Sequence, residues 1–481
     1  MAKAPANNRS ISKLIEGDTI IVLPGGVYGT EQDDNLSGTN ETNYMYGYGG
    51  DDTLRGNGGN DYLDGGVGAD LMIGGTGNDR YFVRDVDDRV VEWANSGDND
   101  WVYAFVHNVI PADDFDDFNY YQLPDNVENV HLAGDALKVI GNDLDNEMVG
   151  NNGNNYLDGK AGADEMRGRQ GNDHYFVDNV GDRVIEYANQ GYDRVTTLID
   201  YYLPDHVEAG RMEGDGDLKL FGNDLDNRLS GNRGDNVFNA GLGNNTVYGL
   251  TGHDILQVDT DNTGIHFFVI DNDSVSFERN IEFAGIEEIH IAGGNGATII
   301  EAQNYTDGMV WLKGNGGNNR LTGTNNSDRL EGGSGNNYLN GLDGHDLLMS
   351  GSFNDTLSGG AGNDTLVGSD LDRASLNEVD HLTGGAGSDT FWLGTTERVF
   401  YETGLYAQHN DYAIITDFSQ AEDKMRLHGQ ATDYQLDNVS MGSINGVGIY
   451  LDDASGQELI AIVRGDTAGL DLSANYFQYV D

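Results

Sequence analysis

The sequence predicts an all-β fold, a parallel β-solenoid built from glycine-rich turns and short strands. Three observations support this prediction. A nine-residue unit recurs in four blocks, which by our alignment hold 6, 4, 4 and 8 copies and start at Gly29, Gly141, Gly222 and Gly314. The eighth position of the unit is apolar in every copy. Glycine supplies 70 of the 481 residues, about twice its usual share, whereas proline supplies only 5.

The nine-residue unit divides into a turn and a strand. Its clearest copies are GGTGNDRYF at 74–82 and GGAGNDTLV at 359–367. The first six residues, rich in glycine, can turn the chain through positive φ angles. The last three form a short strand in which one side chain points inward. We therefore expect the apolar side chains at position 8 to form the core.

The chain is strongly acidic, with 81 acidic against 26 basic residues and a formal net charge of −55. Such a charge repels nucleic acid and anionic membranes, so cations are the natural partners. Apolar residues make up 37% of the chain, enough for a core once the charge is neutralised. Cysteine is absent, which excludes disulfides and thiolate zinc sites.

The unit follows the pattern G-G-x-G-x-D-x-U-x, and on this pattern the four blocks resemble the RTX (repeats-in-toxin) family of calcium-binding proteins that bacteria export by type I secretion. The resemblance implies a right-handed parallel β-roll with two units per coil. It also implies multiple bound Ca²⁺ ions and a secreted, extracellular or cell-surface location.

With two units per coil, position 6 recurs once per coil on one edge, about 4.8 Å from its counterpart in the next coil. Carboxylates stacked at this distance repel by roughly 1 to 4 kcal/mol per pair. Calcium prefers about six to eight oxygen ligands and would reverse this repulsion, so that metal binding and folding become one equilibrium. The expected stacks are Asp52 with Asp70, Asp61 with Asp79, and Asp328 with Asp346 and Asp364.

Position 6 supplies the candidate calcium ligands. It is aspartate in fourteen copies: Asp34, Asp52, Asp61, Asp70, Asp79, Asp164, Asp173, Asp254, Asp328, Asp346, Asp355, Asp364, Asp380 and Asp389. It is asparagine in eight: Asn43, Asn146, Asn155, Asn227, Asn236, Asn245, Asn319 and Asn337. The asparagine copies are expected either to bind calcium weakly or to serve as uncharged, hydrogen-bonded turns.

The blocks alternate with β-rich segments that we expect to continue the sheets. The expected order is an N-terminal cap (1–28, with a capping strand at 20–23), block 1 (29–82), a connecting module (83–140), block 2 (141–176), a second module (177–221), block 3 (222–257), a diverged third module (258–313), block 4 (314–392), and a C-terminal β-rich cap and secretion region (393–481).

The first two connecting modules are copies of one another. Residues 81–95 match 175–189, and residues 123–141 match 203–222. The first copy carries about 13 extra residues near 104–119, an acidic insertion with aromatic residues. This insertion is either a binding loop or a solvated segment.

The apolar stretch at 19–23 is too short for a signal peptide or a membrane helix, which need about 7 to 15 and about 20 apolar residues. If the chain is exported, its signal lies elsewhere. The family resemblance places it at the C-terminus, at 473–481.

No H-E-x-x-H and no G-x-S-x-G motif occurs, which argues against a metalloprotease or a lipase. We expect a non-enzymatic structural protein of a surface layer, a matrix or an adhesive contact, whose repeats fold on calcium after export. Expected partners are calcium, the secretion machinery, and either a cell-surface polysaccharide or further copies of the chain. The alternatives are a carbohydrate-binding accessory protein and a polysaccharide lyase or epimerase. The candidate groups for that enzyme are Tyr120, Tyr121, His131, Tyr201, Tyr202 and His206.

Overall fold

The computed structural model describes residues 21–23, 26–106, 120–134, 137–259, 266–271, 274–276, 280–369, 378–401, 411–453 and 456–480. The chain forms two compact units, 1–228 and 229–481, whose boundary lies within block 3. Regular structure in the described residues is β-strand, apart from one short 3₁₀ helix at Ala431–Asp433. The predicted all-β class is confirmed.

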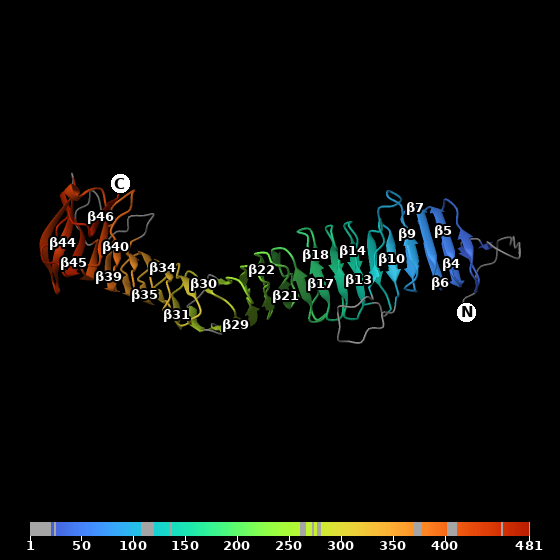
Figure 1. The fold of residues 1–481 in the computed structure, drawn as a ribbon, viewed down its shortest axis with the longest axis horizontal. Helices are drawn as coiled ribbons and strands as arrows, with labels where there is room; N and C mark the ends of the chain where they lie inside the picture. Colours follow the sequence, from blue (N-terminus) through green and yellow to red (C-terminus); the bar gives the residue numbers. More distant parts are fainter. Residues whose placement is uncertain are drawn as a thin grey trace. The chain divides into compact units, whose positions relative to one another are not determined.

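Unit 1 is a parallel solenoid in which each strand pairs with the strand two places along the chain. Its sheets run β1-β2-β4-β6-β8-β10-β12-β14-β16-β18, β3-β5-β7-β9, β11-β13-β15-β17-β19-β21 and β20-β22, with neighbouring strands side by side (Figure 1). The strands are β1 (Ile21–Leu23), β2 (Gly26–Tyr28), β3 (Asn35–Ser37), β4 (Tyr44–Gly49), β5 (Thr53–Gly58), β6 (Tyr62–Val67), β7 (Leu71–Thr76), β8 (Arg80–Val83), β9 (Arg89–Val91), β10 (Trp101–Ala104), β11 (Tyr121–Gln122), β12 (Asn129–Leu132), β13 (Lys138–Ile140), β14 (Glu147–Val149), β15 (Tyr156–Asp158), β16 (Glu165–Arg167), β17 (His174–Val177), β18 (Arg183–Val184), β19 (Arg194–Thr197), β20 (Tyr201–Tyr202), β21 (Ala209–Met212) and β22 (Lys219–Phe221).

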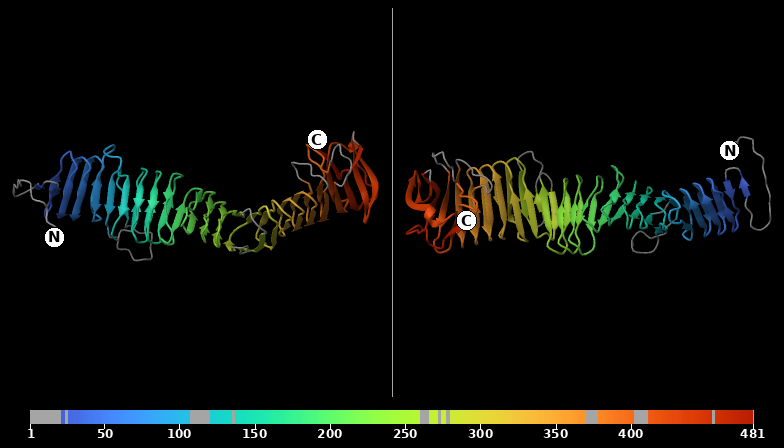
Figure 2. Two further views of the ribbon diagram at one scale, coloured as in Figure 1. Left: turned by 180° about the vertical axis from the view of Figure 1, so that it is seen from behind. Right: turned by 90° about the horizontal axis from the view of Figure 1, so that it is seen from above.

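Unit 2 repeats this plan. Its two sheets run β23-β25-β27-β28-β29-β31-β33-β35-β37-β39-β41-β43-β44-β45 and β24-β26-β30-β32-β34-β36-β38-β40-β42-β46. The colours of its strands follow the sequence along the unit and end in red (Figure 2). The strands are β23 (Arg228–Ser230), β24 (Val237–Asn239), β25 (Asn245–Tyr248), β26 (Ile255–Asp259), β27 (His266–Asp271), β28 (Ser274–Ser276), β29 (Asn280–Ala284), β30 (Glu288–Ala292), β31 (Thr298–Asn304), β32 (Met309–Lys313), β33 (Arg320–Thr322), β34 (Arg329–Ser334), β35 (Tyr338–Asp343), β36 (Leu347–Ser352), β37 (Thr356–Ala361), β38 (Thr365–Val367), β39 (Val379–Ala386), β40 (Thr390–Trp392), β41 (Tyr412–Phe418), β42 (Lys424–His428), β43 (Tyr434–Met441), β44 (Ile444–Asp453), β45 (Gly456–Gly465) and β46 (Phe477–Val480).

Two strands complete one coil within the blocks, so each coil consists of two nine-residue units, as the family resemblance implies. Leu63 of β6 thus lies beside Met45 of β4, and Leu348 of β36 beside Leu330 of β34. All 22 side chains at position 8 are fully buried. Each repeat therefore contributes one apolar side chain to the core, and these side chains stack in a row from strand to strand.

The connecting modules continue the coils rather than interrupting them. Strand β10, from the first module, pairs in parallel with β8 of block 1 and with β12. The strands β17 to β22 repeat the order of β8 to β13, which agrees with the duplication seen in the sequence. Residues 107–119 of the acidic insertion lie outside the described residues.

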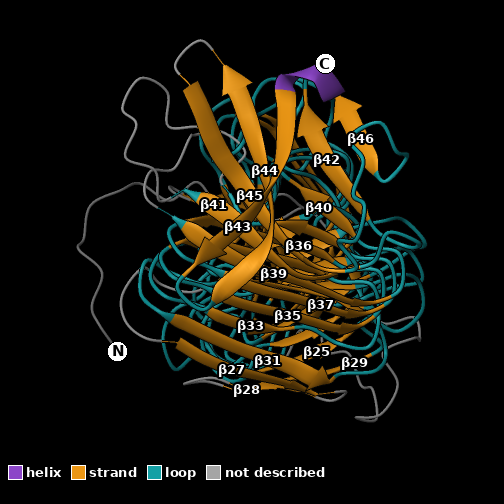
Figure 3. Cartoon of the chain, turned by 90° about the vertical axis from the view of Figure 1, so that its left-hand side faces the viewer, coloured by secondary structure: helices purple, strands orange, loops and turns teal. Residues whose placement is uncertain are grey.

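The parallel arrangement ends in antiparallel strands in both units. In unit 1, β1 pairs antiparallel with β2 and supplies the expected capping strand. In unit 2, β43, β44 and β45 form an antiparallel meander beside the 3₁₀ helix (Figure 3). Such elements cover sheet edges that would otherwise be open to strand addition.

Leu63→Ala should lower the free energy of unfolding by about 2 to 5 kcal/mol, because it leaves a cavity in this fully buried row of side chains. Val67→Ala is the matched control: Val67 ends the same strand, β6, but is 74% exposed, so a change below about 0.5 kcal/mol is expected. Denaturant unfolding in saturating calcium measures both. Equal effects would contradict the inward direction of position 8.

Candidate calcium sites along the turns

The position-6 aspartates stack from coil to coil through a repeated hydrogen bond. In the regular coils, the backbone N–H of each donates to the Oδ1 of its counterpart one coil later. The N···O distance is 2.8 Å from Asp52 to Asp70 and 2.7 Å from Asp61 to Asp79. In block 4, Asp328 and Asp346 each donate in the same way over 2.8 Å. The stacks expected from the sequence are therefore present.

The second carboxylate oxygen of most of these residues has no hydrogen-bond donor. This is true of the buried Oδ2 atom in eleven of the fourteen candidates: Asp52, Asp61, Asp70, Asp79, Asp164, Asp173, Asp254, Asp346, Asp355, Asp364 and Asp389. An unsatisfied buried acceptor is costly, and a native fold rarely contains a series of them. The repetition indicates that all eleven Oδ2 atoms bind the same kind of partner.

In five of these turns, those of Asp52, Asp61, Asp254, Asp346 and Asp364, the Oδ2 atom faces another acceptor, a main-chain carbonyl of the next coil. A Cβ built on Gly56 would lie 2.2 Å from Asp61 Oδ2 and 2.6 Å from the carbonyl oxygen of Gly74. The same pair of oxygens converges at Gly341, with Asp346 Oδ2 at 2.1 Å and the Gly359 oxygen at 2.6 Å. Position 1 must be glycine there because a side chain would displace both oxygens. Two acceptors facing each other require a cation, and hard oxygens suit Ca²⁺.

Where position 6 is asparagine, the side-chain amide can take the place of the cation. Asn319 Nδ2 donates to the carbonyl of Gly332 over 2.9 Å, and Asn337 Nδ2 donates to that of Ser350 over 3.2 Å. These carbonyls occupy the position that Gly74 and Gly359 hold opposite an aspartate. An amide supplies its own donor, whereas a carboxylate does not.

Burial makes the charged form of these carboxyl groups costly when no cation is bound. It raises the pKa of Asp61 to about 6 and that of Asp79 to about 7. The pKa of Asp346 rises to about 8, mainly through burial and further through the charges of Asp328 and Asp364. A divalent ion between the coils would oppose both effects.

Eighteen of the 22 turns fall into two kinds, which differ at position 2. In the turns with an unpartnered Oδ2, here called open turns, position 2 has a positive φ angle. It is often glycine, but it is also Tyr48 (76°), Lys160 (66°), Arg169 (78°) and Leu342 (80°). Non-glycine residues adopt this conformation at a cost. This conformational cost occurs in the same turns in which the Oδ2 atom at position 6 has no partner.

In the second kind, here called closed turns, the position-2 N–H donates to the position-6 side chain. Asn142 donates to Asn146 Oδ1 over 3.0 Å, and Thr324 donates to Asp328 Oδ2 over 2.5 Å. The other position-2 donors of this kind are Thr30, Thr39, Asn151, Asn223 and Asn232. The closed turns are therefore satisfied without an ion, and five of the eight asparagine copies are of this kind.

Three candidate aspartates thus differ from the other eleven. Asp34 and Asp328 accept from threonines in closed turns, and Asp380 Oδ2 accepts from the Tyr401 hydroxyl over 2.8 Å. Threonine at position 2 is the sequence signal for the first two. No local signal identifies Tyr401.

The ladder continues past the blocks onto carboxylates that sequence reasoning missed. Asp88 accepts from the N–H of Asp70 over 3.0 Å, and Glu287 accepts from that of Asp254 over 2.8 Å. Asp88 keeps the spacing of one regular coil and could have been found from it. Glu287 lies well beyond one coil period from Asp254, because its coil contains a longer loop, so the period alone does not reveal it.

The candidate enzyme residues take structural positions. His131 Nε2 lies 3.0 Å from the Arg169 guanidinium, and burial, aided by this charge, lowers the pKa of His131. His206 occupies a turn with φ of 68°, where the first module has Asn126 with φ of 62°. Tyr202 stacks on Phe221 with ring centroids 4.0 Å apart. The two histidines sit at non-equivalent positions of the duplicated modules and form no repeated site.

The comparison with known families agrees with the turn geometry. The RTX calcium-binding nonapeptide repeat matches residues 28–63, 46–81, 140–175, 221–256, 313–348, 340–370 and 378–395. These repeats belong to the RTX calcium-binding family. Calcium is therefore the ion for the RTX blocks, and the solenoid is a β-roll whose oxygen-lined turns fit several Ca²⁺ ions.

Among solved structures, the chain is similar to the extracellular lipase LipA from Serratia marcescens. The identity is 17%, the TM-score is 0.18, and the match covers 60% of this chain and 45% of the lipase chain. No curated protein matches the chain. Among the described residues, no helix is long and apolar enough to cross a membrane.

Proposed function

We propose that this RTX protein is an extracellular structural protein of a surface layer, matrix or adhesive contact, which folds on calcium binding after type I secretion. The observation that carries the proposal is the series of eleven buried, unpartnered Asp Oδ2 atoms, five of which face a main-chain carbonyl of the next coil. A fold with so many opposed acceptors is stable only where calcium is abundant. A dissociation constant for calcium of roughly 10⁻⁴ to 10⁻³ M, typical of extracellular calcium modules, would keep the chain unfolded at the low calcium concentration inside a cell. It would allow the chain to fold at the higher concentration outside.

We propose the fourteen position-6 aspartates as the ligand set. The eleven in open turns are its main members, because their Oδ2 atoms have no other partner. Asp34, Asp328 and Asp380 contribute less, since their Oδ2 atoms already accept a hydrogen bond. Blocks 29–82, 141–176, 222–257 and 314–392 would hold the ions, and the modules 83–140, 177–221 and 258–313 would space them.

A structural role requires no catalytic residues. A coil that extends by repetition can fill such a role directly. The C-terminal region 393–481 would cap the last block and carry the export signal. The surface partner would be a cell-surface polysaccharide or further copies of the chain.

A calcium titration followed by circular dichroism and light scattering tests this proposal. Folding near millimolar calcium, followed by ordered assembly, would support a surface layer. Folding to a monomer would exclude that version and favour the adhesive one. A fold that is independent of calcium would overturn the proposal.

Asp61→Asn should remove a cation ligand while preserving the turn, because the new amide can donate to the Gly74 carbonyl as Asn319 does to Gly332. Loss of one charged ligand worth about 1.5 to 3 kcal/mol predicts roughly 10- to 100-fold weaker calcium binding at that site. Calorimetric titration measures the change. Asp87→Asn, an exposed substitution with the same change in charge, should leave binding unaltered, and equal effects would count against the ligand set.

A further inference from the structure

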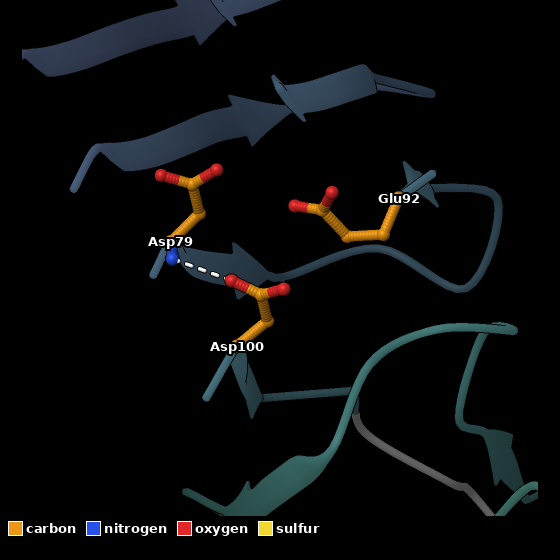
Figure 4. Close-up of side chains that lie close together, drawn as sticks. All are labelled: Asp79, Glu92 and Asp100. Carbon is orange, nitrogen blue, oxygen red and sulfur yellow. Dashed lines mark hydrogen bonds between the residues drawn. The ribbon is translucent and has the colours of Figure 1, made fainter. Parts of the chain in front are cut away.

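Three buried carboxylates meet where block 1 joins the first connecting module. Asp79, Glu92 and Asp100 each place an oxygen within 4.8 Å of the others. Glu92 reaches toward the two aspartates from the segment after β9 (Figure 4). Asp79 and Asp100 are fully buried, and the Oδ2 atom of each has no hydrogen-bond partner. Two unpartnered buried oxygens therefore lie within one acidic cluster.

The same arrangement occurs at the end of block 2. Asp173, Glu186 and Asp193 also bring their oxygens within 4.8 Å of one another. The buried Asp173 Oδ2 and Glu186 Oε2 atoms have no partner. In both clusters the glutamate Oε1 accepts a hydrogen bond from a buried tyrosine hydroxyl, that of Tyr81 or Tyr175.

The glutamates stand where the repeat would place a glycine. Glu92 lies one coil period after Gly74, and Glu186 lies one coil period after Gly168. Within the blocks, this position supplies a carbonyl oxygen opposite the aspartate, as Gly74 does for Asp61. Here a Cβ on Gly74 would lie 2.5 Å from Glu92 Oε1. A carboxylate thus replaces the neutral carbonyl at the last coil of blocks 1 and 2.

Tyrosine occurs at position 8 in the two repeats that are followed by these glutamates. Among the 22 copies, position 8 is tyrosine only at Tyr81 and Tyr175. Each tyrosine holds the glutamate that follows its own repeat. The clusters are therefore built with dedicated residues, and they are not ordinary turns that happen to be acidic.

The surroundings do not neutralise the charge. The charges that act most strongly on Asp100 are those of Glu92, Glu128 and Asp98, all of them acidic. Three carboxylates this close can remain ionised together only around a cation.

We propose that each cluster is a calcium site in which three carboxylates, one of them the aspartate of the last open turn, tie the start of a connecting module to the last coil of its RTX block. Aspartate, glutamate and aspartate side chains supply the hard oxygens that Ca²⁺ requires. The inference rests on the proposed calcium-dependent folding, because the blocks must be folded for the clusters to exist. It adds Glu92, Asp100, Glu186 and Asp193 as ligands that the nonapeptide pattern does not contain.

Anomalous diffraction from crystals of the full chain, with Ca²⁺ replaced by Tb³⁺, tests the two ideas separately. We expect peaks along the open turns and one peak inside each cluster. Peaks along the turns alone would overturn this inference and leave the proposed function intact. An absence of peaks at both places would overturn both.

Glu92→Gln with Glu186→Gln provides the test in solution. Equilibrium dialysis followed by elemental analysis should show a loss of about two Ca²⁺ per chain, one for each cluster. Glu31→Gln with Glu41→Gln removes the same charge from exposed positions and should lose none. Tyr81→Phe with Tyr175→Phe keeps every carboxylate and should retain both ions. An unchanged count in the first variant, or a loss in the tyrosine variant alone, would contradict the site.

Discussion

Chelation of calcium at about pH 7.5 should convert the folded chain into an expanded one that has lost most of its β-sheet circular dichroism. Without the ion, each open turn leaves a buried carboxylate facing a carbonyl, as Asp61 faces Gly74. The formal net charge of −55 then acts against any compact state. Small-angle scattering should give a radius of gyration of about 80 Å, the value expected for an unfolded chain of this length.

Salt provides the control for this experiment. About 1 M NaCl reduces the Debye length to roughly 3 Å and screens repulsion across the surface. It cannot supply a ligand to a buried oxygen, so it should not restore the fold, whereas returned calcium should. A chelated chain as compact and as heat-resistant as the loaded one would show that calcium does not hold the solenoid together.

Acidification should restore β structure to the calcium-free chain. Burial raises the pKa of Asp61, Asp79 and Asp346 to about 6, 7 and 8, above the ordinary value of 3.8. A group whose pKa is raised on folding stabilises the fold fully below its unfolded pKa, and that contribution is lost as the pH rises through the folded value. The calcium-free fold should therefore be most stable near pH 4 and lost between about pH 6 and pH 8.

Circular dichroism of chelator-treated, desalted protein between about pH 8 and pH 4 measures this transition. In the presence of calcium the fold should instead be complete at pH 8, and the calcium midpoint should rise as the pH falls, because protons compete for the same oxygens. A calcium-free chain that is equally unfolded at both extremes would show that proton binding does not substitute for the ion.

The regular part of this molecule was predictable because every coil repeats the same arrangement of an inward side chain at position 8 and a stacked residue at position 6. Position 8 identified the core, and the spacing of two repeat units identified the stacks, as in Asp61 with Asp79. Where the coil length changes, the spacing fails. Asp100 accepts from the N–H of Asp79 over 2.6 Å although its coil is longer than a regular one, and Glu92 joins it from the segment after β9.

The choice between open and closed turns depends on more than the residue at position 2. Asn57 has a φ of 74° in the turn of Asp61, whereas Asn151 donates to Asn155 Oδ1 over 2.8 Å in a closed turn. The same residue type therefore occurs at position 2 of both kinds of turn. Position 2 alone does not predict which kind forms.

The closed turns give three of the four blocks a starting point. The first two turns of blocks 1, 2 and 3 are all closed, from Thr30 and Thr39 in block 1 to Asn223 and Asn232 in block 3. Their side-chain hydrogen bonds form without a metal, so these segments can act as seeds at low calcium. Rising calcium then lengthens structures that already exist, and the slow nucleation step of a repetitive fold is avoided at several points along the chain.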